Sequence, residues 1–169
     1  MPFFRPSTRR LALIAALVLA PSAAHAFDRD AWTGGVQSDG TFQLTCARAG
    51  CSPDTLMTFR RRPARAVANA AAYDGLIAGA VPELRKRGIT AETTPAVRSQ
   101  LGRFTLYRAT RTLTLPDGRR QYYVAGMLVG DDYSLSLTAV APTPDLAARN
   151  FDGLADYLAH HPPKFPDDR

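Results

Sequence analysis

Six stretches of the chain show the alternation of apolar and polar residues that is typical of half-buried strands. Successive side chains of a strand point to opposite faces of a sheet, so the alternation places one set of them in a core. The predicted strands cover residues 36–47, 55–61, 89–98, 103–115, 119–130 and 133–141. A polar lead-in over 27–33, which contains the only tryptophan, is expected before them, and Pro95 should disturb the third strand.

Two further stretches have the three- and four-residue spacing of apolar side chains that predicts amphipathic helices. The first is expected to begin at Pro63, to break near Pro82 and to end at Gly88. The second begins at Thr143, a hydroxyl cap that is followed by proline and aspartate. The apolar stripes are Ala66, Ala70, Tyr73, Ile77, Val81 and Leu84 in the first helix, and Ala147, Phe151, Leu154 and Leu158 in the second.

The resulting order, ββαββββα, predicts the α+β class, with an antiparallel β-sheet and two amphipathic helices packed on it. Residues 27–161 are long enough for one domain with a core and short for two. Residues 162–169, which contain three prolines, are expected to be a flexible C-terminal tail.

This order of elements resembles the Mog1/PsbP-like fold over nearly all of residues 35–161. The stretches that carry the resemblance are Phe42-Gln43-Leu44, Leu56-Met57-Thr58-Phe59 and Asn150-Phe151-Asp152-Gly153-Leu154. Members of that fold are mostly non-catalytic binding, adaptor or assembly-factor proteins, and some are exported by bacteria. The resemblance implies this class of protein and no particular partner.

The first 26 residues have the three parts of a cleavable export signal. These parts are the basic residues Arg5, Arg9 and Arg10, the apolar run 11–20, and the small-residue cleavage signal Ala24-His25-Ala26. Ten apolar residues are too few to cross a bilayer, and no later stretch is long and apolar enough to do so. We therefore predict cleavage after Ala26 and a periplasmic or secreted protein. A buried N-terminal helix is the alternative, and the Arg9-Arg10 pair leaves general secretory and twin-arginine export both open.

Removal of this signal changes the charge of the protein. The full chain has 21 basic and 15 acidic residues and a pI near 9.8. Three of the basic residues lie in the signal, so 18 remain against 15 acidic ones. This mild charge and the expected export both argue against a nucleic-acid partner.

The mature chain contains two cysteines, Cys46 and Cys51, which are separated by a short turn-forming segment. In an oxidising compartment this spacing predicts a local disulfide bond. A metal site would need further ligands, and a redox pair would normally have the C-x-x-C spacing.

Candidates for catalysis are few. The chain has no G-x-S-x-G nucleophile motif and no glycine-rich phosphate loop. The mature histidines, His160 and His161, are adjacent on a predicted helix and therefore point about 100° apart. Asp131-Asp132 is expected to be a turn. We predict no catalytic residue, no metal ligand and no cofactor.

Two groups of residues are candidates for recognition. Arg60, Arg61, Arg62 and Arg65 lie where the second strand meets the first helix, and could bind an anion or an acidic partner. They could equally form a solvated rim that balances nearby acids. The predicted strands also carry Tyr107, Tyr122, Tyr123 and Tyr133, which suit either an exposed recognition face or cross-strand packing.

These observations favour an exported, non-catalytic binding, adaptor or assembly protein that recognises a protein partner or an anionic ligand. Two alternatives stay open. One is an inhibitor or immunity protein that blocks a secreted enzyme, and the other is a small exported hydrolase whose site is assembled from separated residues. Fold class alone does not choose among them.

Overall fold

The computed structural model describes residues 27–48, 51–52, 54–163 and 165. The predicted export signal lies outside the described residues. The strands are β1 (Trp32–Val36), β2 (Phe42–Cys46), β3 (Leu56–Arg62), β4 (Thr90–Thr93), β5 (Val97–Leu101), β6 (Phe104–Thr114), β7 (Arg120–Val129) and β8 (Ser134–Ala141). The helices are the short 3-10 helix η1 (Arg29–Ala31), α1 (Ala70–Gly79), α2 (Val81–Lys86) and α3 (Pro144–His160).

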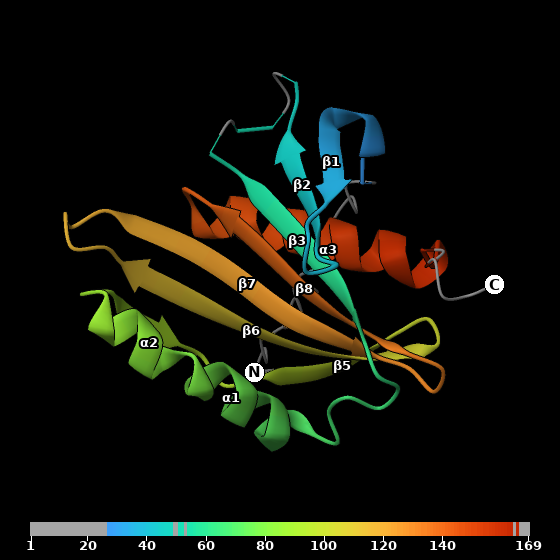
Figure 1. Cartoon of the computed structure of the whole chain (residues 1–169). Coiled ribbons are helices and arrows are strands. Elements are labelled where there is room, and N and C mark those ends of the chain that lie inside the picture. The colour runs from blue at the N-terminus through green and yellow to red at the C-terminus, as the bar shows by residue number, and fades with distance from the viewer. Residues whose placement is uncertain (1–26, 49–50, 53, 164, 166–169) are drawn as a thin grey trace, which may run out of the picture.

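All eight strands belong to one antiparallel sheet with helices on both faces, which confirms the predicted α+β class (Figure 1). The strand order is β1-β2-β3-β8-β7-β6-β4, and β5 pairs with the other half of β6. In the middle of the sheet β3 lies beside β8, with Thr58 opposite Thr138. The sheet therefore joins strands from the two ends of the domain.

The two faces of the sheet carry cores of different size. The larger core lies between the sheet and α3, and the smaller one lies between the sheet and α1. Gly126 of β7 lets α3 come close, because a Cβ there would lie 2.8 Å from the Tyr107 carbonyl oxygen and even closer to the Phe151 ring. Fully buried members of the larger core include Phe104, Phe151, Met57, Leu128, Leu135, Leu137, Leu154 and Leu158.

The strand predicted over 36–47 is shorter than expected: its second half is β2, and its first residues form the end of β1 and the turn between the two strands. The Asp39 carboxylate accepts a hydrogen bond from the Thr41 backbone N–H at 3.0 Å, and Gly40 has a φ of 80°, which favours glycine. Trp32, which was assigned to the polar lead-in, is the first residue of β1. The sheet thus has one more strand at this edge than the sequence predicted.

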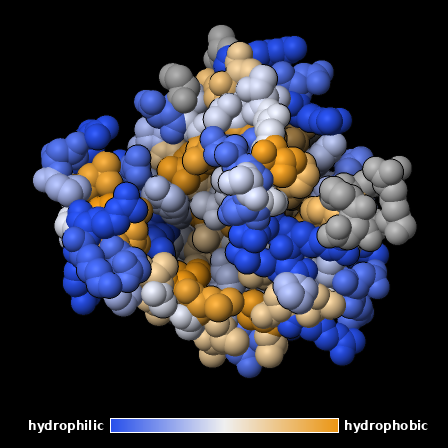
Figure 2. All heavy atoms as spheres, viewed as in Figure 1, coloured by the Kyte–Doolittle hydropathy of each residue, from blue (hydrophilic) through white to orange (hydrophobic). Residues whose placement is uncertain are grey.

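The first predicted helix begins later than expected. β3 continues to Arg62, so Pro63 does not start the helix, and Asn69 caps α1 by accepting a hydrogen bond from the Ala72 N–H at 2.9 Å. The predicted break near Pro82 is confirmed, since Pro82 lies in the first turn of a separate helix, α2. In the space-filling view, charged side chains gather over α2 (Figure 2).

The remaining elements agree closely with the sequence pattern. The third predicted strand is interrupted at Pro95, as expected, and its two halves are β4 and β5. Thr143 caps α3 by accepting from the Leu146 N–H at 3.4 Å. In the predicted tail, Phe165 is buried against Phe42 and Tyr133, whereas residues 164 and 166–169 lie outside the described residues.

Candidate functional site

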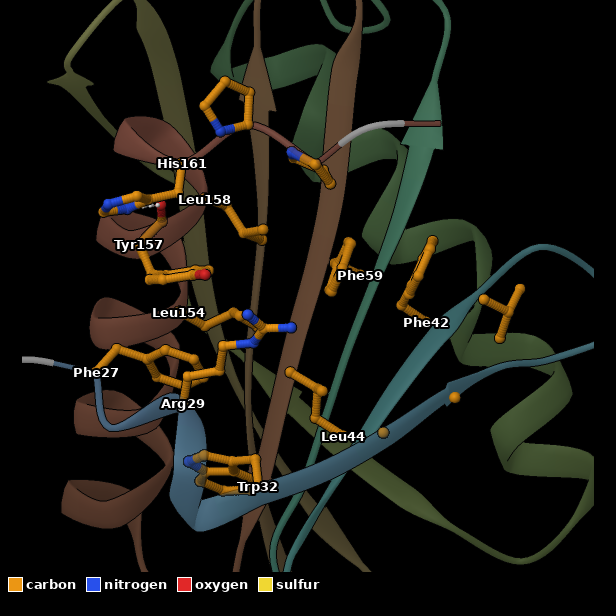
Figure 3. A pocket seen from close by; sticks show the side chains of 15 residues that line it. Phe27, Arg29, Trp32, Phe42, Leu44, Phe59, Leu154, Tyr157, Leu158 and His161 are labelled. Carbon is orange, nitrogen blue, oxygen red and sulfur yellow. Dashed lines mark hydrogen bonds between the residues drawn. The ribbon is translucent and has the colours of Figure 1, made fainter. Parts of the chain in front are cut away.

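An apolar groove of about 550 Å³ lies between α3 and the edge hairpin β1–β2. It forms because α3 packs over β7 and β8, and leaves part of the same sheet face uncovered on β1, β2 and β3. Its aromatic and aliphatic lining comes from four parts of the chain (Figure 3). The lining residues are Phe27, Arg29, Trp32, Gly34, Gly35, Val36, Phe42, Leu44, Phe59, Leu154, Tyr157, Leu158, His161, Pro162 and Pro163.

Aromatic rings that contact one another form the walls of the groove. Phe27 lies 5.2 Å from the Tyr157 ring and 6.3 Å from the Trp32 ring, measured between centroids. On the sheet side, the rings of Phe42 and Phe59 stack at 4.7 Å and are nearly parallel. Such packing fixes the rings before any ligand arrives, which lowers the entropy cost of binding.

Arg29 brings a positive charge into this apolar surface. It belongs to η1, just before β1, and Figure 3 shows its side chain extending toward the middle of the groove. Among the described residues, no carboxylate lies within 4 Å of its guanidinium group. A guanidinium group offers several fixed N–H donors, so this position suits a carboxylate or phosphate group.

The two histidines at the end of α3 have different surroundings. His161 lines the groove, stacks on Tyr157 at 4.7 Å, and its Nδ1 lies 3.2 Å from the Tyr157 carbonyl oxygen. His160 turns instead toward Asp156, with its Nδ1 3.4 Å from the carboxylate. They do not face one site, which agrees with their helical spacing.

The predicted arginine cluster is divided between the two faces of the sheet. Arg60 pairs with Asp39 at 3.2 Å, and Arg65 pairs with Asp131 at 3.0 Å. The Arg62 Nε donates to the Ser136 hydroxyl at 3.1 Å. Arg61 points to the opposite face, where its guanidinium group lies over the rings of Phe165, at 4.9 Å, and Tyr133, at 5.6 Å.

These contacts determine how the arginine cluster could serve as a binding surface. Hydrogen bonds from Thr41, and then the charge of Arg60, hold the pKa of Asp39 below its usual range, so this pair stays charged in neutral solution. Arg60, Arg61 and Arg62 line a second groove, also of about 550 Å³, which shares Val36 and Phe42 with the aromatic groove. Arg65 does not line it.

The four tyrosines do not form one exposed face. Tyr107 packs against Tyr73 in the smaller core, whereas Tyr133 is buried in the larger core beside Phe104. Tyr122 is half-buried and also faces the α3 side. Tyr123, next to it in β7, points to the opposite face, where its hydroxyl contacts the Gln121 amide oxygen at 3.1 Å. Their arrangement is that of packing residues rather than of a recognition surface.

The predicted disulfide bond between Cys46 and Cys51 is present, with the two Cα atoms 5.6 Å apart. It closes the turn between β2 and β3, and neither cysteine lines the groove, although Cys46 lies opposite Trp32 in the strand pairing. In the part of the chain that the structure describes, no three His, Cys, Asp or Glu side chains are grouped so that they could hold a metal ion. No helix in that part is both long and apolar enough to cross a membrane.

Sequence reasoning missed the groove because its lining is scattered. Phe27, Arg29 and Trp32 lie in the stretch that was assigned to a polar lead-in, and they meet α3 only in the folded chain. The one available signal was two aromatic residues within an otherwise polar segment. Aromatic side chains in a segment without secondary structure often mark contact with a core or a ligand.

Comparison with known proteins adds no relative from which a function could be transferred. The chain matches no protein-family model. No curated protein is similar to it at a significant level. The candidate site therefore rests on the geometry of the described residues.

Proposed function

We propose that this chain is an exported binding protein whose aromatic groove holds a ligand with an apolar body and an anionic group. The predicted export signal and the Cys46–Cys51 disulfide bond support a location outside the cytoplasm. The resemblance in element order to the Mog1/PsbP-like fold supports a binding role.

The position of Arg29 is the observation that carries this proposal. Its guanidinium group enters an aromatic groove, and no described carboxylate neutralises it. Ligand sites commonly combine apolar walls with a few polar groups that fix orientation. The apolar part of a ligand would lie on Phe42 and Phe59, and its anionic group would meet Arg29.

The lining favours binding over catalysis. Among the described residues that line the groove there is no serine, cysteine, aspartate or glutamate, so the groove offers neither a serine-type or cysteine-type nucleophile nor a carboxylate base. The Nδ1 of His161 meets the Tyr157 carbonyl oxygen at 3.2 Å, and among the described residues no carboxylate lies within 4 Å of its ring nitrogens. For this reason we favour the binding protein over the small hydrolase.

The single tryptophan of the chain makes the proposal directly testable. Trp32 lines the groove, so its fluorescence should change saturably when a ligand enters. We would titrate the mature protein with decanoate and with decanol, two probes that have the same chain length and differ in charge. Because Arg29 is solvent-exposed, its preference for the anion should be modest, roughly fivefold to tenfold in affinity.

Substitution of the arginine provides the control. Arg29→Gln should bring decanoate down to the affinity of decanol, whereas Arg87→Gln, an exposed arginine at the end of α2, should preserve the preference. A Trp32 signal that does not saturate with either probe would exclude the groove as the site. If the Arg29→Gln variant still preferred decanoate over decanol as strongly as the wild type does, Arg29 would have no role in recognising the anion.

A further inference from the structure

One side of strand β1 has backbone groups without a partner strand. Within the described part of the chain, β1 is the end strand of the sheet and pairs only with β2. The hydrogen bonds from Ala47 N to Ala31 O, at 2.9 Å, and from Gln37 N to Thr41 O, at 2.8 Å, fix the phase of this pairing. In an antiparallel pair every second residue bonds to the neighbour. Thr33 and Gly35 therefore bond to β2, and Gly34 and Val36 direct their N–H and C=O groups outward.

The two edges of the sheet differ in how they are protected. Proteins usually block free edges with charged side chains, proline or interruptions, because an open edge accepts foreign strands. The opposite edge has all three devices, since β4 and β5 carry Glu92 and Arg98 and are separated by Pro95. β1, with the sequence Trp-Thr-Gly-Gly-Val, carries no charge and no proline. Val36 is also 61% exposed.

The open edge borders the aromatic groove. Trp32, Gly34 and Val36 line the groove from β1. A strand added to this edge would place every second side chain on the same face, beside the groove, because paired strands share their alternation. Arg29, directly before β1, lies at one end of that row and is open to a carboxylate.

We propose that β1 accepts an extended segment of a protein partner, which adds a ninth strand to the eight-stranded sheet. Main-chain hydrogen bonds to Gly34 and Val36 would provide affinity that does not depend on sequence. Specificity would come from apolar side chains at alternate positions, which enter the groove, and from one acidic residue that meets Arg29. This inference rests on the proposed function and identifies its ligand as a peptide strand rather than a free amphiphile.

The test uses an acetylated and amidated hexapeptide of alternating valine and threonine with a glutamate at one end. Two matched control peptides carry N-methyl groups on alternate amides, one on the odd-numbered and one on the even-numbered residues. In one of the two, the amides that face β1 are methylated and cannot donate hydrogen bonds to it. The mature protein is titrated with each peptide while Trp32 fluorescence is recorded. We expect saturable binding of the parent peptide and at least a tenfold loss in one methylated phase.

Amide exchange provides a readout on the protein side. The Gly34 and Val36 amides should exchange at least tenfold more slowly when the peptide is bound, because they gain acceptors. Thr33 and Gly35 are internal controls, since their amides already bond to β2. Val36→Pro should abolish peptide binding without the loss of a bond within the sheet, whereas Val36→Ala, which keeps the N–H and loses only side-chain contact with the groove, should bind more tightly than Val36→Pro and more weakly than the wild type.

Each outcome gives a decision. Equal binding of all methylated peptides, or unchanged exchange at Gly34 and Val36, overturns strand addition. Decanoate binding without peptide binding overturns it as well and leaves the proposed function standing, whereas failure of both probes removes the two together. Protection of Gly34 and Val36 that rises with protein concentration, without peptide, would show instead that a second copy occupies the edge.

Discussion

The Arg111 side chain of β6 donates from its Nη2 to the Ile77 carbonyl oxygen in the last turn of α1, at a distance of 2.7 Å. Its Nε also donates to the Thr93 hydroxyl of β4, at 3.1 Å. Burial lowers the pKa of this guanidinium group, and the electrostatic influence of Tyr73 and Tyr123 opposes that effect. One side chain thus connects a helix end to two strands, and it adds a second donor to a carbonyl oxygen that already accepts from the Ala80 N–H at 3.2 Å.

Arg111→Met should destabilise the protein by about 2 kcal/mol, because it removes charge-assisted hydrogen bonds while it keeps most of the apolar stem. The measurement is the free energy of unfolding in urea. Arg98→Met, at an exposed position of β5, is the matched control and should change stability by less than about 0.5 kcal/mol. Similar losses in both variants would show that the Ile77 and Thr93 contacts contribute little.

Gly126 and Gly75 should respond in opposite ways to substitution by alanine. At Gly126 a Cβ would collide with the Tyr107 carbonyl oxygen and the Phe151 ring, so Gly126→Ala should cost roughly 2 kcal/mol or more. At Gly75, in the exposed part of α1, a Cβ meets nothing within 4 Å, so Gly75→Ala should stabilise by about 0.5–1 kcal/mol. Thermal unfolding of the two variants checks both signs, and a stable Gly126→Ala protein would contradict the close packing of α3.

Tyr73 should make the protein less stable in alkaline solution. Burial raises the pKa of the Tyr73 hydroxyl, because the ionised form is poorly solvated beside Tyr107. The folded state therefore holds its proton at a pH where the unfolded state has lost it, and the free energy of unfolding falls as pH rises above about 10. Below that pH the effect is absent.

The measurement is the urea midpoint of the wild type and of Tyr73→Phe at pH 8 and pH 11. The variant should lose part of the alkaline destabilisation. Some will remain, because burial also raises the pKa of Tyr123. If the urea midpoint fell by the same amount between pH 8 and pH 11 in both proteins, Tyr73 would not remain buried and protonated.

The Cys46–Cys51 disulfide bond should contribute only modestly to stability, because it closes a short loop. A loop of this length predicts a loss of about 2 kcal/mol in the Cys46→Ala, Cys51→Ala double variant. Ligand binding, followed by Trp32 fluorescence, should be preserved, since neither cysteine lines the groove. A variant that folds normally and no longer binds would show that the β2–β3 turn positions the site.

The sequence predicted the elements with a strong local signal. Pro82 and Pro95 marked breaks that the structure confirms, and Thr143 marked the start of α3, since each acts on its own backbone. The β1–β2 hairpin was not predicted because Gly34 and Gly35 weaken the alternating pattern of β1. Residues 32–36 form a strand because they pair with β2, and this pairing is not visible in their local sequence.

The candidate site was less accessible to prediction than the fold. Arg60 and Arg65 drew attention as neighbours in the sequence, yet each pairs with an acid from a distant turn. Arg29 lies between Asp28 and Asp30 in the sequence, where nothing local marks it as a site residue, and its importance depends on aromatic rings from β2, β3 and α3 that come together only in three dimensions. The number of charged residues in one stretch of sequence is therefore a poor guide to binding here, because the fold determines which of these charges are paired with an opposite charge.

The pairing of β3 with β8 has a consequence for how the chain becomes folded. Residues near the start of the domain, such as Thr58, find their strand partner only near its end, at Thr138. Strands β1, β2 and β3 can therefore join the rest of the sheet only after nearly the whole polypeptide has been synthesised. Such long-range pairing slows folding and keeps incomplete chains open. The native sheet, and with it the groove, is a property of the finished polypeptide rather than of any nascent intermediate.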